Sequence, residues 1–434
     1  MKKLLIFTMA IMLVAYGASF ATLTKTLTMG NANNIVHDDG NIWLYPSTFY
    51  NYPDLAIGEF ASDNFYDFGI HYKFGEESPI MLGAYFTTRQ PFDLPDRPFS
   101  WNVLDDIIGA TINPASTGPN RIPNRRIDLF FGYMMGQNPV GLHLDYISCS
   151  RKQEFDSIPG APDTPAQKIE ESISNLGLDL GVTMMQGDAD LAAGINLLSF
   201  TDKNSLGNDE NKPSGNMGFY IMGRFFHSMN PKVTVVPHAK FSYDKTGYEH
   251  YGNAATPAIA GTMTEEYKFT DMVFDLGIGM NYSPAAGILA VGDIGFMMSN
   301  WKEEFTDWIV VVDSVQVTEE YKENTTALPY FRIGMDAAIF DWLDLRLGAT
   351  SFWTSYVEED NNINSTAPPT TYSWTEKWTN GYVNNSTYLG AGFHWGNFKA
   401  DAYVNPAIFT RGLNFISGQS YTMNTQVSVL YEMF

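Results

Sequence analysis

The stretch Asp271–Met298, DMVFDLGIGMNYSPAAGILAVGDIGFMM, forms two alternating arms around a turn at residues 283–286. In the first arm every second residue is apolar: Met272, Phe274, Leu276, Ile278, Met280 and Tyr282. A period of two residues is that of a β-strand with two different faces. Each arm has about 11 to 13 residues, longer than the ~5–6 of an average globular strand. Tilted strands of about 9–11 residues cross a bilayer, so the stretch predicts a membrane-spanning β-hairpin.

The same pattern recurs along most of the chain. Pairs of alternating segments flank short turns near Gly75, Gly136, Gln186, Met229, Pro284, Asp341 and Gly396. Long polar segments separate these hairpins, at roughly 89–125, 150–172, 201–214, 246–267, 300–327, 354–385 and 406–420. The run WIVVVDSVQV within 300–327 could extend the strands above the membrane or fold inward. Short turns alternating with long loops are typical of bacterial outer-membrane barrels, with the turns periplasmic and the loops extracellular.

Seven hairpins supply 14 strands, and Asp54–Phe60 and Tyr421–Phe434 can add an opening and a closing strand. Lipid offers backbone groups no hydrogen-bond partners, so a sheet crosses it only as a closed barrel. The predicted fold class is therefore all-β. It is a transmembrane antiparallel β-barrel over residues 54–434 with about 16 strands, 14 being the main alternative.

The N-terminus has the features of a secretory signal peptide over residues 1–21. Lys2 and Lys3 precede an apolar run from Leu4 to Val14, and Ser19-Phe20-Ala21 fits a cleavage site. Residues 22–53 are rich in Asn, Asp and Pro and do not alternate. We expect this segment to form a plug inside the barrel or to run along its periplasmic rim.

Composition excludes several classes of protein. A net charge of −22 argues against a nucleic-acid partner, which requires patches of Lys and Arg. The single cysteine, Cys149, excludes a disulfide framework. His143 and Asp145 share a face, but no nucleophile accompanies them at motif spacing, so we do not expect an enzyme. We expect no cofactor and no metal. The two stretches with possible metal ligands are His37-Asp38-Asp39, which is more typical of a turn, and residues 202–211, which are more typical of an acidic loop.

The chain resembles bacterial outer-membrane β-barrel proteins and ends, as they do, in an aromatic residue, Phe434. The resemblance implies recognition of Phe434 by the barrel-assembly machinery and residence in the outer membrane. Met29-Gly30-Asn31-Ala32, followed by Asp38-Asp39 and Tyr45-Pro46-Ser47, is similar to the start of the FadL-type family. That family transports long-chain fatty acids and hydrocarbons and has an N-terminal hatch in the lumen. The resemblance makes Asn31, Asp38 and Asp39 candidate plug residues.

The polar face of the predicted strands supplies candidate pore-lining residues. They are Asp67, His71, Lys73, Asp128, His143, Asp145, Asp179, Asp275, Asp293, Arg332, Asp336, Asp344 and Arg346. An excess of carboxylates would favour cations and repel anions. Alternatively, the charges hydrate the lumen and pair with one another across it.

Three functions are compatible with these patterns. The first is a channel for the passive passage of small solutes through a polar, acidic lumen. The second is FadL-type uptake of hydrophobic molecules with an N-terminal hatch. The third is a surface adhesin or an assembly or secretion component with a blocked barrel, whose long loops would bind a partner. Apart from outer-membrane lipid, small solutes are the expected partners, and a homo-oligomer is compatible with the sequence.

Overall fold

The computed structural model describes residues 23–61, 66–87, 126–155, 167–204, 209–251, 263–309, 315–365, 371–404 and 425–433. The predicted signal peptide and Phe434 lie outside these ranges. No helix within them is long and apolar enough to cross a membrane.

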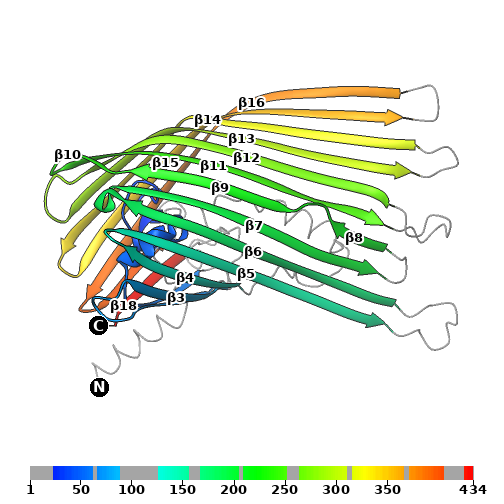
Figure 1. The fold of residues 1–434 in the computed structure, drawn as a ribbon. Helices are drawn as coiled ribbons and strands as arrows, with labels where there is room; N and C mark the ends of the chain where they lie inside the picture. The colour runs from blue at the N-terminus through cyan, green and yellow to red at the C-terminus, as the bar shows by residue number, and fades with distance from the viewer. Residues whose placement is uncertain are drawn as a thin grey trace, which may run out of the picture.

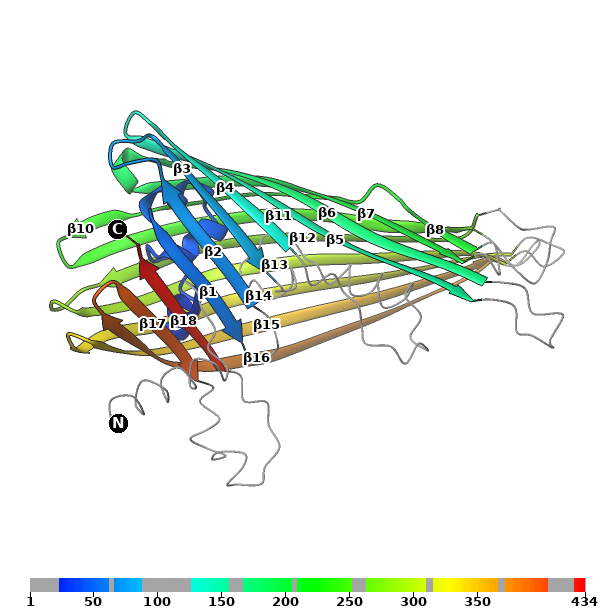
Figure 2. The ribbon, with the colours of Figure 1, turned by 90° about the horizontal axis from the view of Figure 1, so that it is seen from below.

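The described strands form one closed antiparallel sheet (Figures 1 and 2). Eighteen segments take part, but β8, β9 and β10 all pair with β11 and follow one another along a single strand, which leaves sixteen strands (18 − 2). β1 pairs with β18 from Leu55 opposite Glu432 to Ala61 opposite Gln426, which closes the barrel. The predicted fold class and the count of about 16 strands are confirmed.

The segments are β1 (Leu55–Ala61), β2 (Tyr66–Lys73), β3 (Ile80–Thr87), β4 (Arg126–Met135), β5 (Asn138–Phe155), β6 (Gln167–Met184), β7 (Ala189–Asn204), β8 (Asp209–Pro213), β9 (Met217–Phe225), β10 (His227–Asn230), β11 (Val233–Tyr251), β12 (Met263–Tyr282), β13 (Ile288–Ile309), β14 (Val315–Phe340), β15 (Leu343–Ser365), β16 (Thr371–Trp395), β17 (Phe398–Val404) and β18 (Thr425–Glu432). The described ranges also contain four short helices: α2 (Leu23–Thr28), η1 (Asp39–Trp43), η2 (Pro46–Asn51) and η4 (Met185–Gly187).

Alternation along each strand gives the wall an apolar outer face and a polar inner face. On β12, Leu276 and Ile278 are 50% and 51% exposed and point outward, whereas Asp275 is 5% exposed and points inward. A closed sheet leaves no unpaired backbone edge, and its exposed apolar face suits lipid. The barrel is therefore built to span a membrane.

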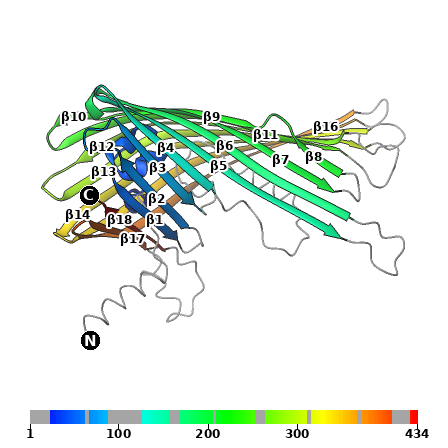
Figure 3. The same cartoon turned by 60° about the horizontal axis from the view of Figure 1, so that its bottom comes forward.

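The described parts of the strands differ greatly in length around the barrel. β1, β2, β17 and β18 have seven or eight residues, whereas β14 has 26 and β16 has 25 (Figure 3). At ~3.4 Å per residue, β14 rises about 88 Å along its own axis. The apolar band of an outer-membrane barrel is only about 25 Å tall. One side of the barrel therefore continues far beyond the membrane.

This length corrects part of the loop prediction. Much of 246–267, 300–327 and 354–385 is strand, in β11 to β16. The outer face of these extensions is charged, with ion pairs such as Lys302–Glu304 at 3.1 Å and Lys268–Glu266 at 2.8 Å. Because both faces are polar there, the alternation that marks a membrane-spanning strand disappears, although the backbone pairing continues.

We expect the outer face to tolerate charge only outside the apolar band. Ile278→Arg should lower the free energy of unfolding by about 2–4 kcal/mol, the cost of Arg at mid-membrane on a barrel. Thr379→Arg, outward on the charged part of β16, should change it by less than about 0.5 kcal/mol. Denaturant unfolding in lipid vesicles measures both. Equal effects would contradict this placement of the membrane.

Candidate functional site: the segment inside the barrel

Residues 23–52, here called the inner segment, lie inside the barrel at the end where the tight turns are (dark blue in Figures 1 and 2). The segment comprises α2, η1 and η2. Asp38 caps η1: its Oδ1 accepts from Gly40 N at 3.1 Å, and Asn41 Oδ1 accepts from Asp38 N at 3.0 Å. This bonding follows from the preference of Asp and Asn for caps and turns. It gives the segment a fixed shape without a long helix.

Three apolar clusters join the inner segment to different parts of the wall. Leu44 and Tyr45 pack with residues of β7, β9, β11 and β12. Ile42, Trp43 and Phe49 pack with residues of β1, β3 and β4. The stretch from Met29 to Val36 packs with Phe226 and with residues of β11 and β13. Together with α2, which lies against β15 to β18, these contacts run around the whole circumference.

Glycines on the inner face of the wall make room for the inner segment's backbone. They are cross-strand neighbours in two pairs: Gly141 and Gly181, and Gly334 and Gly348. A Cβ on Gly141 would overlap the carbonyl of Pro46, and a Cβ on Gly348 would overlap the backbone nitrogen of Gly30. Here glycine is required by close approach of two backbones. The wall is therefore shaped to receive this segment.

Arg224 of β9 is the main polar anchor. Its side chain is fully buried and pairs with Asp190 of β7 at 2.8 Å. Its remaining donors reach the inner segment: Nη1 donates to the carbonyls of Asn33 and Val36, both at 2.9 Å, and Nη2 to Asn41 Oδ1 at 2.8 Å. A buried guanidinium is tolerated only when its charge and donors are satisfied. Arg224 therefore depends on the inner segment as much as the segment depends on it.

Two further contacts reinforce this anchor. The Arg224 guanidinium lies 4.4 Å from the centre of the Tyr45 ring, within cation–π range. Thr183 Oγ1 lies 2.8 Å from Ser47 Oγ and 2.6 Å from Asp190 Oδ1, which ties η2 to the same carboxylate.

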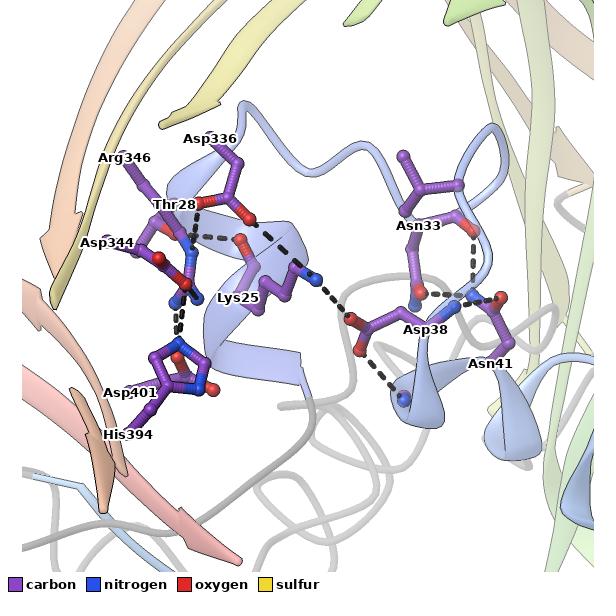
Figure 4. A network of polar contacts seen from close by, with 12 residues as sticks. Lys25, Thr28, Asn33, Asp38, Asn41, Asp336, Asp344, Arg346, His394 and Asp401 are labelled. Atoms are coloured by element: carbon purple, nitrogen blue, oxygen red, sulfur yellow. Dashed lines mark hydrogen bonds and ion pairs between the residues drawn. The ribbon is translucent and has the colours of Figure 1, made fainter. Parts of the chain in front are cut away.

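A second polar network holds α2 against β14, β15 and β17 (Figure 4). Arg346 contacts three carboxylates: Asp336 at 3.1 Å, Asp344 at 3.4 Å, and Asp401. His394 Nε2 lies 2.6 Å from Asp344. From the inner segment, Lys25 lies 3.7 Å from Asp336 and 3.6 Å from Asp38, and so bridges wall and segment.

A cavity of about 480 Å³ adjoins this second network. Its lining includes Lys25, Asp38, Asp39, Arg346 and Asp401. The Asp38 carboxylate raises the pKa of Lys25 above its ordinary value. Burial, with the neighbouring Asp38 carboxyl, raises the pKa of Asp39 well above its usual range. The docked segment therefore favours a protonated Asp39.

The other candidates from the sequence also lie on the inner face, in separate groups. Asp128 and Asp179 flank His143, at 2.8 and 2.7 Å. Arg126 donates to Asp128 and lies 3.9 Å from Asp145. Asp128, His143 and Asp145 place one potential metal-ligand atom each within 4.8 Å of one another. The Arg126 guanidinium already supplies positive charge at this point. Trp43 of the inner segment covers the group, 5.6 Å from the His143 ring.

Asp275 and Asp293 belong to a third group. The Tyr330 hydroxyl donates to Asp275 at 2.8 Å, and Asp293 lies 3.1 Å from His238 and 3.6 Å from Arg332.

The remaining candidates are placed singly. His71 lies 2.6 Å from the Tyr85 hydroxyl and 2.7 Å from the Tyr52 carbonyl. Lys73 lies over the Tyr50 ring, and Asp67 is buried. Asn31 has a positive φ of 57° beside Gly30.

Sequence reasoning missed several residues that hold the inner segment: Lys25, Arg126, Asp190, Arg224 and Asp401. The alternation of β9 could have revealed Arg224, because Tyr220, Met222 and Arg224 share the inner face. Nothing in the sequence shows which of these charges meet.

No protein-family model and no curated protein matches the chain. Among solved structures, it is similar to the toluene transporter TodX of Pseudomonas putida, with 8% identity, a TM-score of 0.36, and coverage of 96% of this chain and 99% of that one. It is also similar to the alcaligin outer-membrane receptor FauA of Bordetella pertussis (8% identity, TM-score 0.35, coverage 81% and 67%) and the ferric yersiniabactin uptake receptor FyuA of Yersinia pestis (9%, 0.33, 88% and 81%).

At these scores the likeness does not extend beyond general barrel architecture. The closed sheet, its apolar outer face and its polar inner face identify the chain as a β-barrel of the bacterial outer-membrane type.

We expect Arg224→Leu to loosen the inner segment without unfolding the wall. The change strips four hydrogen bonds from the segment and its anchor and leaves Asp190 buried without its partner. Breaking a buried pair from one side costs about 3–5 kcal/mol. Hydrogen exchange of residues 23–52 should accelerate at least tenfold, while β12–β15 stay protected. Lys399→Ala, which removes a half-exposed pair with Glu432, should leave exchange unchanged. Unchanged exchange in Arg224→Leu would contradict the anchor.

We expect docking of the inner segment to depend on pH through Asp39. Its pKa is raised in the docked state and ordinary once released, so docking binds a proton. The stabilisation of docking that Asp39 provides is complete below the ordinary pKa of an Asp side chain, near 4. It is lost as the pH rises toward the raised pKa of the docked state. Relative to Asp39→Asn, wild-type hydrogen exchange in residues 23–52 should therefore accelerate progressively as pH rises above about 4. The two proteins should match near pH 4. Asp188→Asn, at an exposed turn, should follow the wild type.

Proposed function

We propose that this protein transports small solutes across the bacterial outer membrane and that the inner segment is its hatch. The observation that carries the proposal is the contact of residues 23–52 with the wall around the whole circumference. A solute moving through the barrel would have to displace or bypass this segment. Within the described ranges, the segment is joined to the barrel by the chain entering β1, by hydrogen bonds and ion pairs that involve side chains, and by apolar contacts, an arrangement that would let it move as a unit.

The arrangement favours a gated transporter over a permanently open pore. Several residues expected to line open water are instead buried: Asp128 and His143 are 0% exposed, and Arg346 is 1% exposed. Asp128 and His143 bond each other, Arg346 bonds three other carboxylates of the wall, and both groups lie beside the inner segment. The FadL-type alternative fits this feature, since the similar stretch at residues 29–47 lies within the inner segment. A blocked barrel acting as an adhesin would need no anchor that can be released.

Solute flux through single proteins in planar bilayers tests the proposal. Wild-type protein should show a low conductance with brief openings, and Arg224→Ala with Ser47→Ala should raise the open fraction at least tenfold. The expected reason is the loss of bonds that Arg224 and Ser47 make across the segment–wall interface. Lys399→Ala serves as the matched control at the same end of the barrel.

Two results would overturn the proposal. Steady conductance of the wild type, unchanged in the double variant, would indicate an open pore that the inner segment does not control. Absence of conductance and of liposome uptake in both proteins, with folding verified by heat-dependent gel migration, would indicate a barrel that does not transport.

A further inference from the structure

The inner face of the tall wall, beyond the inner segment, carries an ordered mixture of aromatic and acidic side chains. Two adjacent cross-strand rows run over β12, β13, β14, β15 and β16. The first row is Asp271, Trp301, Glu323, Glu358 and Trp378. The second row is Phe269, Glu303, Tyr321, Asp360 and Glu376. Directly opposed residues point to the same face, and Asp271 and Phe269 are buried on the inside.

These ten positions hold four aromatic residues, six carboxylates and no basic residue. The outward row between them on the same strands is Thr270, Lys302, Lys322, Glu359 and Lys377. The formal charge is therefore −6 for the two inner rows and +2 (3 − 1) for the outer row. Lys268, Lys302, Lys322 and Lys377 all lie on the outer face of this part of the wall, together with Glu304, Glu320 and Glu359, so the inner surface is negative and the outer one carries both signs.

Three of the aromatic rings are in contact with one another and lead down to the inner segment. Phe269 and Trp301 lie 5.2 Å apart and Trp301 and Tyr321 5.3 Å apart, both edge to face. Trp301 also packs against the cluster that contains Leu44 and Tyr45 of the inner segment. Trp378, at the other end of the first row, is 49% exposed. Phe269, Trp301 and Tyr321 thus form a continuous aromatic strip that reaches the inner segment, and Trp378 lies farther along the first row, beyond Glu323 and Glu358.

We propose that these two rows bind an organic cation with an apolar or aromatic body. Aromatic faces attract cations, most strongly when carboxylates beside them add Coulomb attraction. The same rings receive an apolar body by stacking. A neutral solute would gain nothing from the six carboxylates, and an anion would be repelled by them. A bare metal ion would gain nothing from the rings. Only a molecule with both properties uses every part of the surface.

This inference rests on the proposed function in one respect: it assumes that the bound cation is the solute that the protein transports. Binding itself requires no transport, so the two can fail separately. Binding of the cation by a protein without hatch-dependent flux would overturn the proposed function and leave the site. Flux without cation binding would overturn the site alone.

Calorimetric titration of the folded full chain in a neutral detergent tests the site. The probe is benzyltrimethylammonium, which joins a permanent charge to an aromatic ring. Benzyl alcohol supplies the ring without the charge, tetramethylammonium supplies the charge with little apolar surface, and calcium chloride supplies a metal cation. We expect benzyltrimethylammonium to bind at least about tenfold more tightly than the two partial mimics, which is about 1.4 kcal/mol. Calcium should not displace it at equal concentration.

Two double variants distinguish binding by the inner carboxylates from attraction of the cation by the net negative charge of the whole protein. Glu323→Gln with Glu358→Gln removes two inward charges from β14 and β15. Glu320→Gln with Glu359→Gln removes two outward charges from the same strands. The inward pair should weaken binding about tenfold or more, and the outward pair less than twofold. Trp301→Leu, which keeps an apolar side chain but loses the π face, should weaken binding of benzyltrimethylammonium more than that of benzyl alcohol.

Three outcomes would overturn the inference. Equal binding of benzyl alcohol and benzyltrimethylammonium would indicate a merely apolar surface. Equal weakening by the two double variants would indicate a diffuse field with no site. Displacement by calcium, with no effect of Trp301→Leu, would indicate an acidic metal-binding face.

Discussion

Pairing of every backbone group within the sheet is the constraint on which the rest of this structure depends. In lipid an unpaired amide or carbonyl costs several kcal/mol, so the sheet must close, and β1 does so by pairing with β18 along its whole length. Closure creates an interior that lipid cannot fill. The alternating pattern then assigns polar side chains to that interior, and these in turn need partners.

The inner segment supplies many of those partners. Arg224 and Arg346 are both buried charges on the wall: Arg224 is satisfied by Asp190 and by residues 33–41 of the inner segment, and Arg346 by wall carboxylates, of which Asp336 also pairs with Lys25. Charges of this kind add little net stability compared with apolar packing. They do fix where the segment sits. Apolar clusters supply the free energy of docking, and the charged groups supply its position.

The sequence predicted the barrel well because lipid imposes a simple rule on each strand. Residues 271–298 follow that rule plainly, and applying it along the whole chain predicts the number of strands. It fails in β13 and β14 beyond the membrane, where Lys302 and Glu320 occupy outward positions and the apolar alternation ends. Inward residues such as Asp128 and Arg346 followed from the same rule. Their pairings did not, because Asp401 is 55 residues from Arg346 and they meet only once β15, β16 and β17 are in register.

The bonds between Arg224 and the inner segment join residues 183 to 191 positions apart in the chain. Contacts of such long separation form late, since the loop they close must be ordered first. The glycines that receive the segment likewise come from strands on opposite sides of the barrel, so the pocket they form exists only after the wall has assembled. We therefore expect the first residues of the described chain to be the last to become ordered during folding. Each newly assembled barrel would then pass through a stage in which its wall is complete and the inner segment has not yet docked.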